Sequence, residues 1–133
     1  MNNRIETVVL DSQGLSAWIA QDRRTLALIR LFHSMGADLV VCASTLVEVA
    51  PAQAPADRLD WVLSQVRVEP VSERAARGSA ALLEQAGLHG RGHAANATVA
   101  ELALRQPGPV ALLASDVDDL ARLCGGRVLL IAV

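Results

Sequence analysis

The chain has 133 residues, of which 52% are hydrophobic and 20% are charged. This composition favours a single domain over residues 1–133 with a compact core, and it excludes a disordered or fibrous protein. The formal net charge of −2 excludes a globally basic nucleic-acid-binding protein. Any RNA contact would depend on a local group of arginines, such as Arg23, Arg24, Arg30 and Arg91.

The amino-terminal stretch and the cysteines predict a cytoplasmic protein. The stretch MNNRIETVVLDSQG has no long apolar segment, so we expect no secretory signal. No apolar run approaches the ~18 residues of a membrane span. Cys42 and Cys124 match neither a disulfide framework nor a metal-binding CxxC pattern. We therefore expect two buried thiols in a reducing compartment and no contact with a membrane.

Short apolar segments alternate with longer helical ones along the chain. In order, the patterns predict the following elements: strand 5–10, helix 13–35, strand 39–43, helices within 44–64, strand 66–70, helix 72–87, helix 92–106, strand 110–114, helix 117–124 and strand 128–133. Pro51 and Pro55 are expected to divide 44–64 into two pieces, and Ser44 and Ser72 are expected to cap the helices that follow them. Strands that alternate with helices in this way predict an α/β protein with a mainly parallel sheet of buried strands.

Several acids are predicted to meet at one edge of this sheet. In open parallel sheets the functional crevice lies at the carboxyl ends of the strands. Asp11 directly follows the first strand, and Glu48 lies one turn into the helix after the second. Asp116 follows the fourth strand, with Asp119 close by. The helix before that strand runs antiparallel to it, so Asn96, about 6 Å from the start of that helix, is expected at the same edge.

Each of these acids has an alternative structural role. Asp11 or Asp116 could cap the helix that follows it. Glu48 has apolar neighbours in the sequence, and its burial without a partner would be costly. Glu69 ends the third strand and is not excluded, whereas Asp38 is expected at the opposite edge. Clustered carboxylates repel one another, and a divalent cation with oxygen ligands would relieve that repulsion.

Four stretches, VVLDSQGLSAWI, ASTLVEV, HAANATVAELAL and LLASDVDDLARLCG, resemble the successive motifs of PIN domains in their order and spacing. The resemblance covers nearly the whole chain and extends to small stand-alone PIN proteins similar to the VapC-type toxins of toxin–antitoxin pairs. It implies a three-layer α/β/α sandwich with a mainly parallel five-stranded sheet. It also implies a Mg²⁺- or Mn²⁺-dependent endoribonuclease with an RNA substrate, a cognate antitoxin and a homodimeric assembly.

This resemblance implies four metal-binding and catalytic positions, Asp11, Glu48, Asn96 and Asp116, with Asp119 as an auxiliary metal-binding acid. The chain departs from the pattern at one of them, because the family places aspartate where this chain has Asn96. An amide oxygen can bind Mg²⁺ or Mn²⁺ but brings no negative charge to the cation. We therefore expect cation binding to be weakened and the nuclease activity to be reduced or lost.

Two functions stay open at this point: a weakened endoribonuclease, and a catalytically inactive PIN-like module that binds RNA or a protein. His93 lies three residues before Asn96 and could supply a nitrogen ligand or a general base, or could simply be a partly exposed histidine. A phosphoacceptor or phosphatase domain is disfavoured, because Gln13 stands where a second acid would be needed and the sequence contains no lysine.

Overall fold

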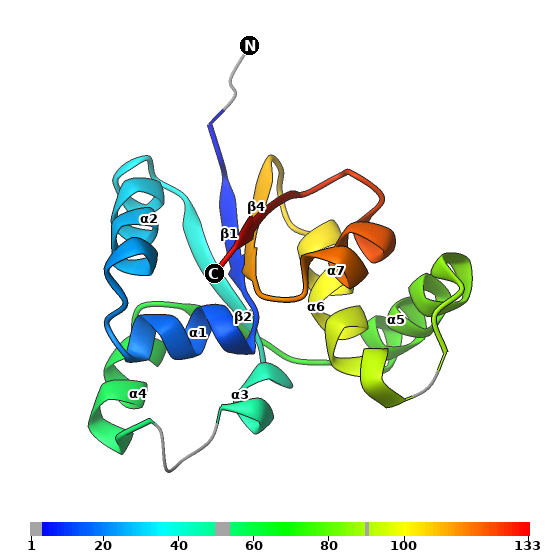
Figure 1. Cartoon of the computed structure of the whole chain (residues 1–133), viewed down its shortest axis with the longest axis horizontal. Coiled ribbons are helices and arrows are strands. Elements are labelled where there is room, and N and C mark those ends of the chain that lie inside the picture. The colour runs from blue at the N-terminus through cyan, green and yellow to red at the C-terminus, as the bar shows by residue number, and fades with distance from the viewer. Residues whose placement is uncertain (1–3, 50–53, 90) are drawn as a thin grey trace.

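The computed structural model describes residues 4–49, 54–89 and 91–133 and has a central sheet with helices on both faces (Figure 1). The strands are β1 (Thr7–Leu10), β2 (Asp38–Cys42), β3 (Arg67–Glu69), β4 (Val110–Ala114) and β5 (Leu129–Ala132). The helices are α1 (Ser12–Ile19), α2 (Arg23–Ser34), α3 (Thr45–Glu48), α4 (Ala56–Leu63), α5 (Glu73–Ala86), the short η1 (Arg91–His93), α6 (Ala94–Leu104) and α7 (Val117–Cys124). None of the helices in these ranges is long and apolar enough to cross a membrane.

The sheet has five strands in the order β3-β2-β1-β4-β5, and every neighbouring pair is parallel. In the centre of the sheet, Leu10 of β1 aligns with Val41 of β2 and Leu113 of β4. The carboxyl ends of these three strands therefore share one edge. We call this edge, with the residues that follow the strands and the start of α6, the acidic rim.

Two hydrophobic clusters, one on each face of the sheet, produce the three layers. Val8 and Leu10 of β1 point to the cluster that packs under α1, α2 and α4, whereas Val9 points to the cluster under α6 and α7. Figure 1 shows the two groups of helices on opposite sides of the sheet. Central strands that are covered on both faces favour apolar residues, which is why β4 and residues 8–10 of β1 are continuous hydrophobic runs. The expected α/β/α sandwich with a five-stranded parallel sheet is confirmed.

The two edge strands are less buried than the sequence predicts. Val68 of β3 is 38% exposed and Leu129 of β5 is 52% exposed, because each of these strands has a neighbour on one side only. The expectation of buried strands was wrong for β3 and β5, in which no residue is buried. Apolar composition alone does not distinguish a short edge strand from a central one.

The predicted helix 13–35 is in fact two helices, α1 and α2. The chain turns between them at Gln21, whose φ of 60° lies in the left-handed region. Asp22 then caps α2, because its Oδ2 accepts hydrogen bonds from the backbone N–H and the hydroxyl of Thr25 at 3.0 and 2.9 Å. These bonds hold the pKa of Asp22 below its ordinary value. No glycine or proline marks this turn in the sequence. The helical spacing of apolar residues continues through it, and the sequence therefore predicts one helix.

The expected division of residues 44–64 is confirmed at Pro55, which stands at the start of α4. Pro51 lies outside the described residues. The expected cap at Ser44 was wrong, because its side chain makes no capping hydrogen bond to α3. Ser72 does cap α5, accepting a hydrogen bond from the Ala75 N–H at 3.1 Å.

Candidate active site

Asp11 is the first residue after β1 and is anchored to two neighbouring elements. Its Oδ1 accepts a hydrogen bond from the backbone N–H of Gly14 at 2.8 Å, so Asp11 caps α1. Its Oδ2 accepts one from the backbone N–H of Ser115 at 3.3 Å, which ties the carboxylate to the segment after β4. The start of α1 can lie against β4 because residue 14 is a glycine: a Cβ there would stand 2.6 Å from the carbonyl oxygen of Leu113.

The carboxyl group of Asp11 is unusual because the residue is only 5% exposed. Burial is the main cause that raises the pKa of Asp11 above its ordinary value. The backbone N–H groups of Gly14, Ser115 and Gln13 act in the opposite direction, and the negative charge of Asp116 raises the pKa further. Ionisation of Asp11 therefore costs more free energy in the fold than in the unfolded chain. A cation beside Asp11 and Asp116 would reduce that cost.

Asn96 and Asp116 form a direct contact at the acidic rim. Asn96 lies in the first turn of α6, and its Nδ2 donates a hydrogen bond to Oδ2 of Asp116 at 3.0 Å. Asp116 precedes α7 but makes no capping hydrogen bond to it, so capping does not account for this side chain. At position 96 the rim therefore has a proton donor where an aspartate would add a second negative charge.

Asp119, in the first turn of α7, is held against His93. The Nδ1 atom of His93 lies 2.5 Å from Oδ2 of Asp119. The two side chains are 30% and 19% exposed, so the pair is partly shielded from water. His93 is thus a partly exposed histidine, and it is also fixed to an acid of the rim. A cation that binds Asp119 would compete with the imidazole for this oxygen.

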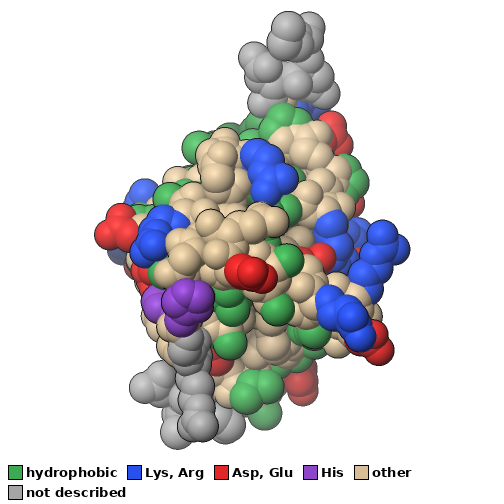
Figure 2. Space-filling view, turned by 90° about the vertical axis from the view of Figure 1, so that its right-hand side faces the viewer, with side chains coloured by type: hydrophobic (Ala, Val, Ile, Leu, Met, Phe, Trp, Pro, Cys, Tyr) green, Lys and Arg blue, Asp and Glu red, His purple; other side chains and the backbone are tan. Residues whose placement is uncertain are grey.

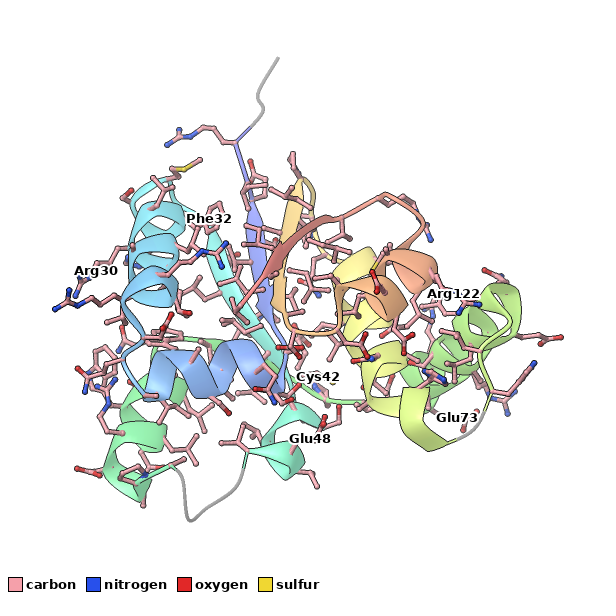
Figure 3. All side chains as sticks on the ribbon, viewed as in Figure 1. Arg30, Phe32, Cys42, Glu48, Glu73 and Arg122 are labelled. Atoms are coloured by element: carbon pink, nitrogen blue, oxygen red, sulfur yellow. The ribbon has the colours of Figure 1, made fainter. Side chains whose placement is uncertain are left out.

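Glu48 differs most from the sequence-based prediction. The helix that carries it, α3, is a single turn of four residues, and both Val47 and Glu48 face solvent. The argument that apolar neighbours bury Glu48 was therefore wrong. Its carboxylate makes no hydrogen bond or ion pair with any other described residue. Figure 3 shows Glu48 on α3 close to Cys42, at the same edge of the sheet as the end of β2.

A chain of polar contacts that the sequence analysis missed joins the end of β2 to α6. The Sγ of Cys42 lies 3.0 Å from the Oγ of Ser44, and this Oγ lies 3.0 Å from the Oγ1 of Thr98. The Thr98 hydroxyl also donates to the carbonyl oxygen of Ala95 at 2.8 Å. Because Thr98 is within one turn of Asn96 and Ser44 precedes α3, these contacts fix α3 to the start of α6. No sequence pattern indicates this pairing, since it exists only once the helix packs on the sheet.

The donor atoms at the acidic rim are of the kind that Mg²⁺ and Mn²⁺ prefer: carboxylate oxygens of Asp11, Asp116 and Asp119, and the amide oxygen of Asn96. Within the described ranges, no three His, Cys, Asp or Glu side chains are placed together as a metal-binding group. The contacts above explain this arrangement, because Asp11 faces backbone N–H groups, Asp119 faces His93 and residue 96 is an amide. The residues fit one divalent cation chemically, provided that these side chains exchange their present partners for the ion.

Comparisons with known proteins identify the fold. No family sequence model matches this chain, and no curated protein matches it. A chain in the crystal structure of VapBC2 from Rickettsia felis, bound to a DNA fragment from its promoter, superposes on it with a TM-score of 0.72. The superposition covers 96% of this chain and 98% of that chain, at 15% sequence identity. The PIN-type fold expected from the resemblance is therefore confirmed, and at this identity the likeness shows the fold alone.

Proposed function

We propose that this protein is a PIN-type endoribonuclease that depends on Mg²⁺ or Mn²⁺ and is weakened by Asn96. The observation that carries the proposal is the buried carboxylate of Asp11 beside Asp116, with its raised pKa. A carboxylate kept buried with a raised pKa at the edge of a parallel sheet is typical of a functional site rather than of a stabilising contact.

The residues of the acidic rim would have the following roles. Asp11 and Asp116 would bind the cation through carboxylate oxygens, and Asn96 through its amide oxygen, while Asp119 and the exposed Glu48 would assist. When bound, the cation would supply an activated water and charge stabilisation for the leaving oxygen of RNA. The Nδ1 of His93 is held by Asp119 at 2.5 Å, which leaves Nε2 as the atom that would accept or donate a proton.

The partners of the proposed enzyme follow from the same likeness. The similar solved structure is of VapBC2 with promoter DNA. We propose that this chain likewise binds an antitoxin protein, forms a homodimer and acts on RNA in the cytoplasm. Co-expression with a candidate antitoxin, followed by size-exclusion chromatography with light scattering, would test both the assembly and its stoichiometry.

A second candidate function is a catalytically inactive PIN-like module that binds RNA or a protein. The hydrogen bond from Asn96 to Asp116 favours it, because this bond gives Asp116 a partner without any cation. The two candidates differ in what restoring a carboxylate at position 96 would do. A weakened enzyme would regain activity, whereas a binding module would stay inert.

Cleavage of single-stranded and structured RNA with Mn²⁺ or Mg²⁺ would test the proposal, with the unchanged protein compared with Asn96→Asp and Asp11→Asn. We expect Asn96→Asp to cut at least tenfold faster than the unchanged protein, and Asp11→Asn to be inactive. Asp118→Asn is the matched control, because Asp118 is an exposed acid of α7. If none of these proteins cuts and calorimetry detects no cation binding to Asn96→Asp, the nuclease proposal is wrong.

A further inference from the structure

A pocket of about 250 Å³ lies between α1, α2 and α4, on the opposite face of the sheet from α6. Its walls include Trp18 and Trp61, the only two tryptophans of the chain. Their ring centroids are 6.4 Å apart and their planes meet at 87°. Trp18 is buried, whereas Trp61 is 50% exposed, so part of its indole is accessible to a ligand.

Three basic side chains line the same pocket: Arg30 and His33 from α2, and Arg58 from α4. The guanidinium carbon of Arg58 lies 5.2 Å from the centre of the Trp61 ring. Among the residues that the structure describes, no carboxylate pairs with any of the three. Other arginines are neutralised locally, for example Arg77 by Glu73 at 2.8 Å. The pocket therefore combines aromatic surface with positive charge that the protein itself does not balance.

One polar atom at the pocket has no partner. The Nε of Arg58 is buried without a hydrogen-bond acceptor in the described part of the chain, and its Nη2 reaches only the carbonyl oxygen of Trp18, at 3.5 Å. A buried donor that lacks an acceptor is costly and is rare in folded proteins. An anionic ligand would supply the missing acceptor if the Arg58 side chain turned its buried Nε toward the pocket.

The pocket stands at a fixed distance from the acidic rim. α1 begins beside Asp11 and carries Trp18 at its far end, seven residues later, which corresponds to about 10 Å along the helix. α1 is thus a rigid connection between the rim and the pocket. A single strand of RNA that lies along α1 would reach both.

We propose that this pocket binds one base of single-stranded RNA by stacking it on Trp61, with Arg58 and Arg30 on the adjacent phosphates. This inference rests on the proposed nuclease function and adds a second RNA contact outside the acidic rim. Aromatic side chains bind bases through their faces, and arginine contributes both stacking and paired hydrogen bonds to phosphate. Figure 3 shows Arg30 projecting outward from α2, where an extended backbone can approach it.

The charge at this pocket differs from that on the face around α5 and α7. Figure 2 shows the side of the molecule around α5 and α7, where basic, acidic and apolar side chains are intermingled. The chain is acidic overall, with a net charge of −2, so unpaired cations beside an exposed indole are a local feature. An acidic protein segment could satisfy the charge, but it would not use the exposed face of Trp61 for base stacking.

The intrinsic fluorescence of the full chain provides the test, because both tryptophans line the pocket and the sequence has no tyrosine. The titrant is a single-stranded RNA of about eight nucleotides, added in the presence of EDTA so that no cleavage occurs. We expect saturable quenching, and we expect Trp61→Ala and Arg58→Gln each to weaken binding at least about fivefold. Trp61→Phe should retain most of the affinity. Arg77→Gln, on α5, is the matched control and should change nothing.

The other outcomes separate this inference from the proposed function. If RNA binds with unchanged affinity to Trp61→Ala and Arg58→Gln, the pocket is not an RNA site, whether or not the protein cuts RNA. If a polyglutamate peptide competes as well as RNA, the pocket recognises charge or protein and the inference is wrong. If RNA quenches the unchanged protein and Asp11→Asn equally but no variant cuts RNA, the pocket is an RNA site and the nuclease proposal fails.

Discussion

Asn96 and Asp116 are joined by a hydrogen bond of 3.0 Å from the amide Nδ2 to the carboxylate Oδ2. A carboxylate at position 96 would instead face Asp116 with a like charge and no shared proton. The residue at this position therefore decides whether the acidic rim is satisfied within the protein or depends on a cation. Three of the predictions below follow from how charge and hydrogen bonds are arranged at this rim.

Asn96→Asp should couple the stability of the protein to divalent cations. With EDTA present, the variant should melt a few degrees below the unchanged protein, because it loses a hydrogen bond and gains a charge repulsion. Its affinity for Mn²⁺ should rise at least about tenfold, since a carboxylate near the ion is worth roughly 2–4 kcal/mol. Differential scanning fluorimetry with and without Mn²⁺ measures both effects. Gln85→Glu, which adds the same charge at an exposed site on α5, should show neither.

The effect of Asp11→Asn on stability should depend on pH. The pKa of Asp11 is raised in the fold, mainly by burial, so the native state binds this proton more tightly than the unfolded chain does. The contribution of Asp11 to stability is therefore fully present below the ordinary value of 3.8 and is lost as the pH rises through the raised pKa. The melting temperature of the variant relative to that of the unchanged protein should therefore rise from pH 4 to pH 7. Asparagine also causes a pH-independent loss, because it has one oxygen where Asp11 uses two to accept the hydrogen bonds from Gly14 and Ser115. Asp38→Asn, at an exposed carboxylate, should show no such pH-dependent gain. A difference in melting temperature that stays constant or falls from pH 4 to pH 7 would contradict the argument.

Gly14→Ala should destabilise the fold, because the new Cβ would stand 2.6 Å from the backbone oxygen of Leu113. Neither α1 nor β4 can move without disturbing the cap at Asp11. We expect a loss of about 1–3 kcal/mol and a melting temperature lower by roughly 4–12 °C. Gly92→Ala is the matched control, because nothing lies within 4 Å of a Cβ there. Equal melting temperatures for the two variants would show that this contact does not constrain α1.

Thr98→Val should weaken the connection between α3 and α6. It removes the hydroxyl that lies 3.0 Å from Ser44 and keeps the shape of the side chain, so the expected cost is about 1 kcal/mol. Urea denaturation would measure this loss as a lower midpoint with an unchanged slope. Thr98→Ser retains the hydroxyl and should lose much less. If both variants behaved alike, packing rather than the hydrogen bond would connect the two helices.

The thiol of Cys124 should be unreactive in the folded protein. Burial raises the pKa of Cys124 to about 11, so little thiolate exists at pH 8. Titration with Ellman's reagent should detect no fast-reacting Cys124 in the native state, and both thiols of the chain should react after denaturation. Rapid reaction of Cys124→Ser together with slow reaction of Cys42→Ser would assign any native reactivity to Cys42.

The sequence was enough to predict the layered fold, the parallel sheet and the edge at which Asp11, Asn96 and Asp116 lie. These features depend on the spacing of apolar residues along the sequence and on the position of residues relative to the ends of strands. Features that depend on tertiary contact could not be predicted. Glu48 was expected to be buried because its sequence neighbours are apolar, but a single-turn helix exposes it. The turn at Gln21 was missed because glutamine is not a residue type that indicates a left-handed backbone conformation.

The pocket was missed for a related reason. Trp18 and Trp61 belong to helices that are distant in the sequence, and neither residue alone indicates a binding site. The group of arginines expected to contact RNA was chosen by type alone, and of these only Arg30 lines the pocket. The side chain of Arg91 lies outside the described residues.

The central position of β1 also constrains the order in which the acidic rim can form. The hydrogen bond from Ser115 to Asp11 joins residues 104 positions apart, and β1 lacks one of its two neighbours until β4 has been synthesised. A nascent fragment that ends before β4 would carry Asp11 and Glu48 but could not bring Asp116 to them. Translation would therefore deliver the assembled rim only near the end of synthesis, and shorter products released from the ribosome would lack it.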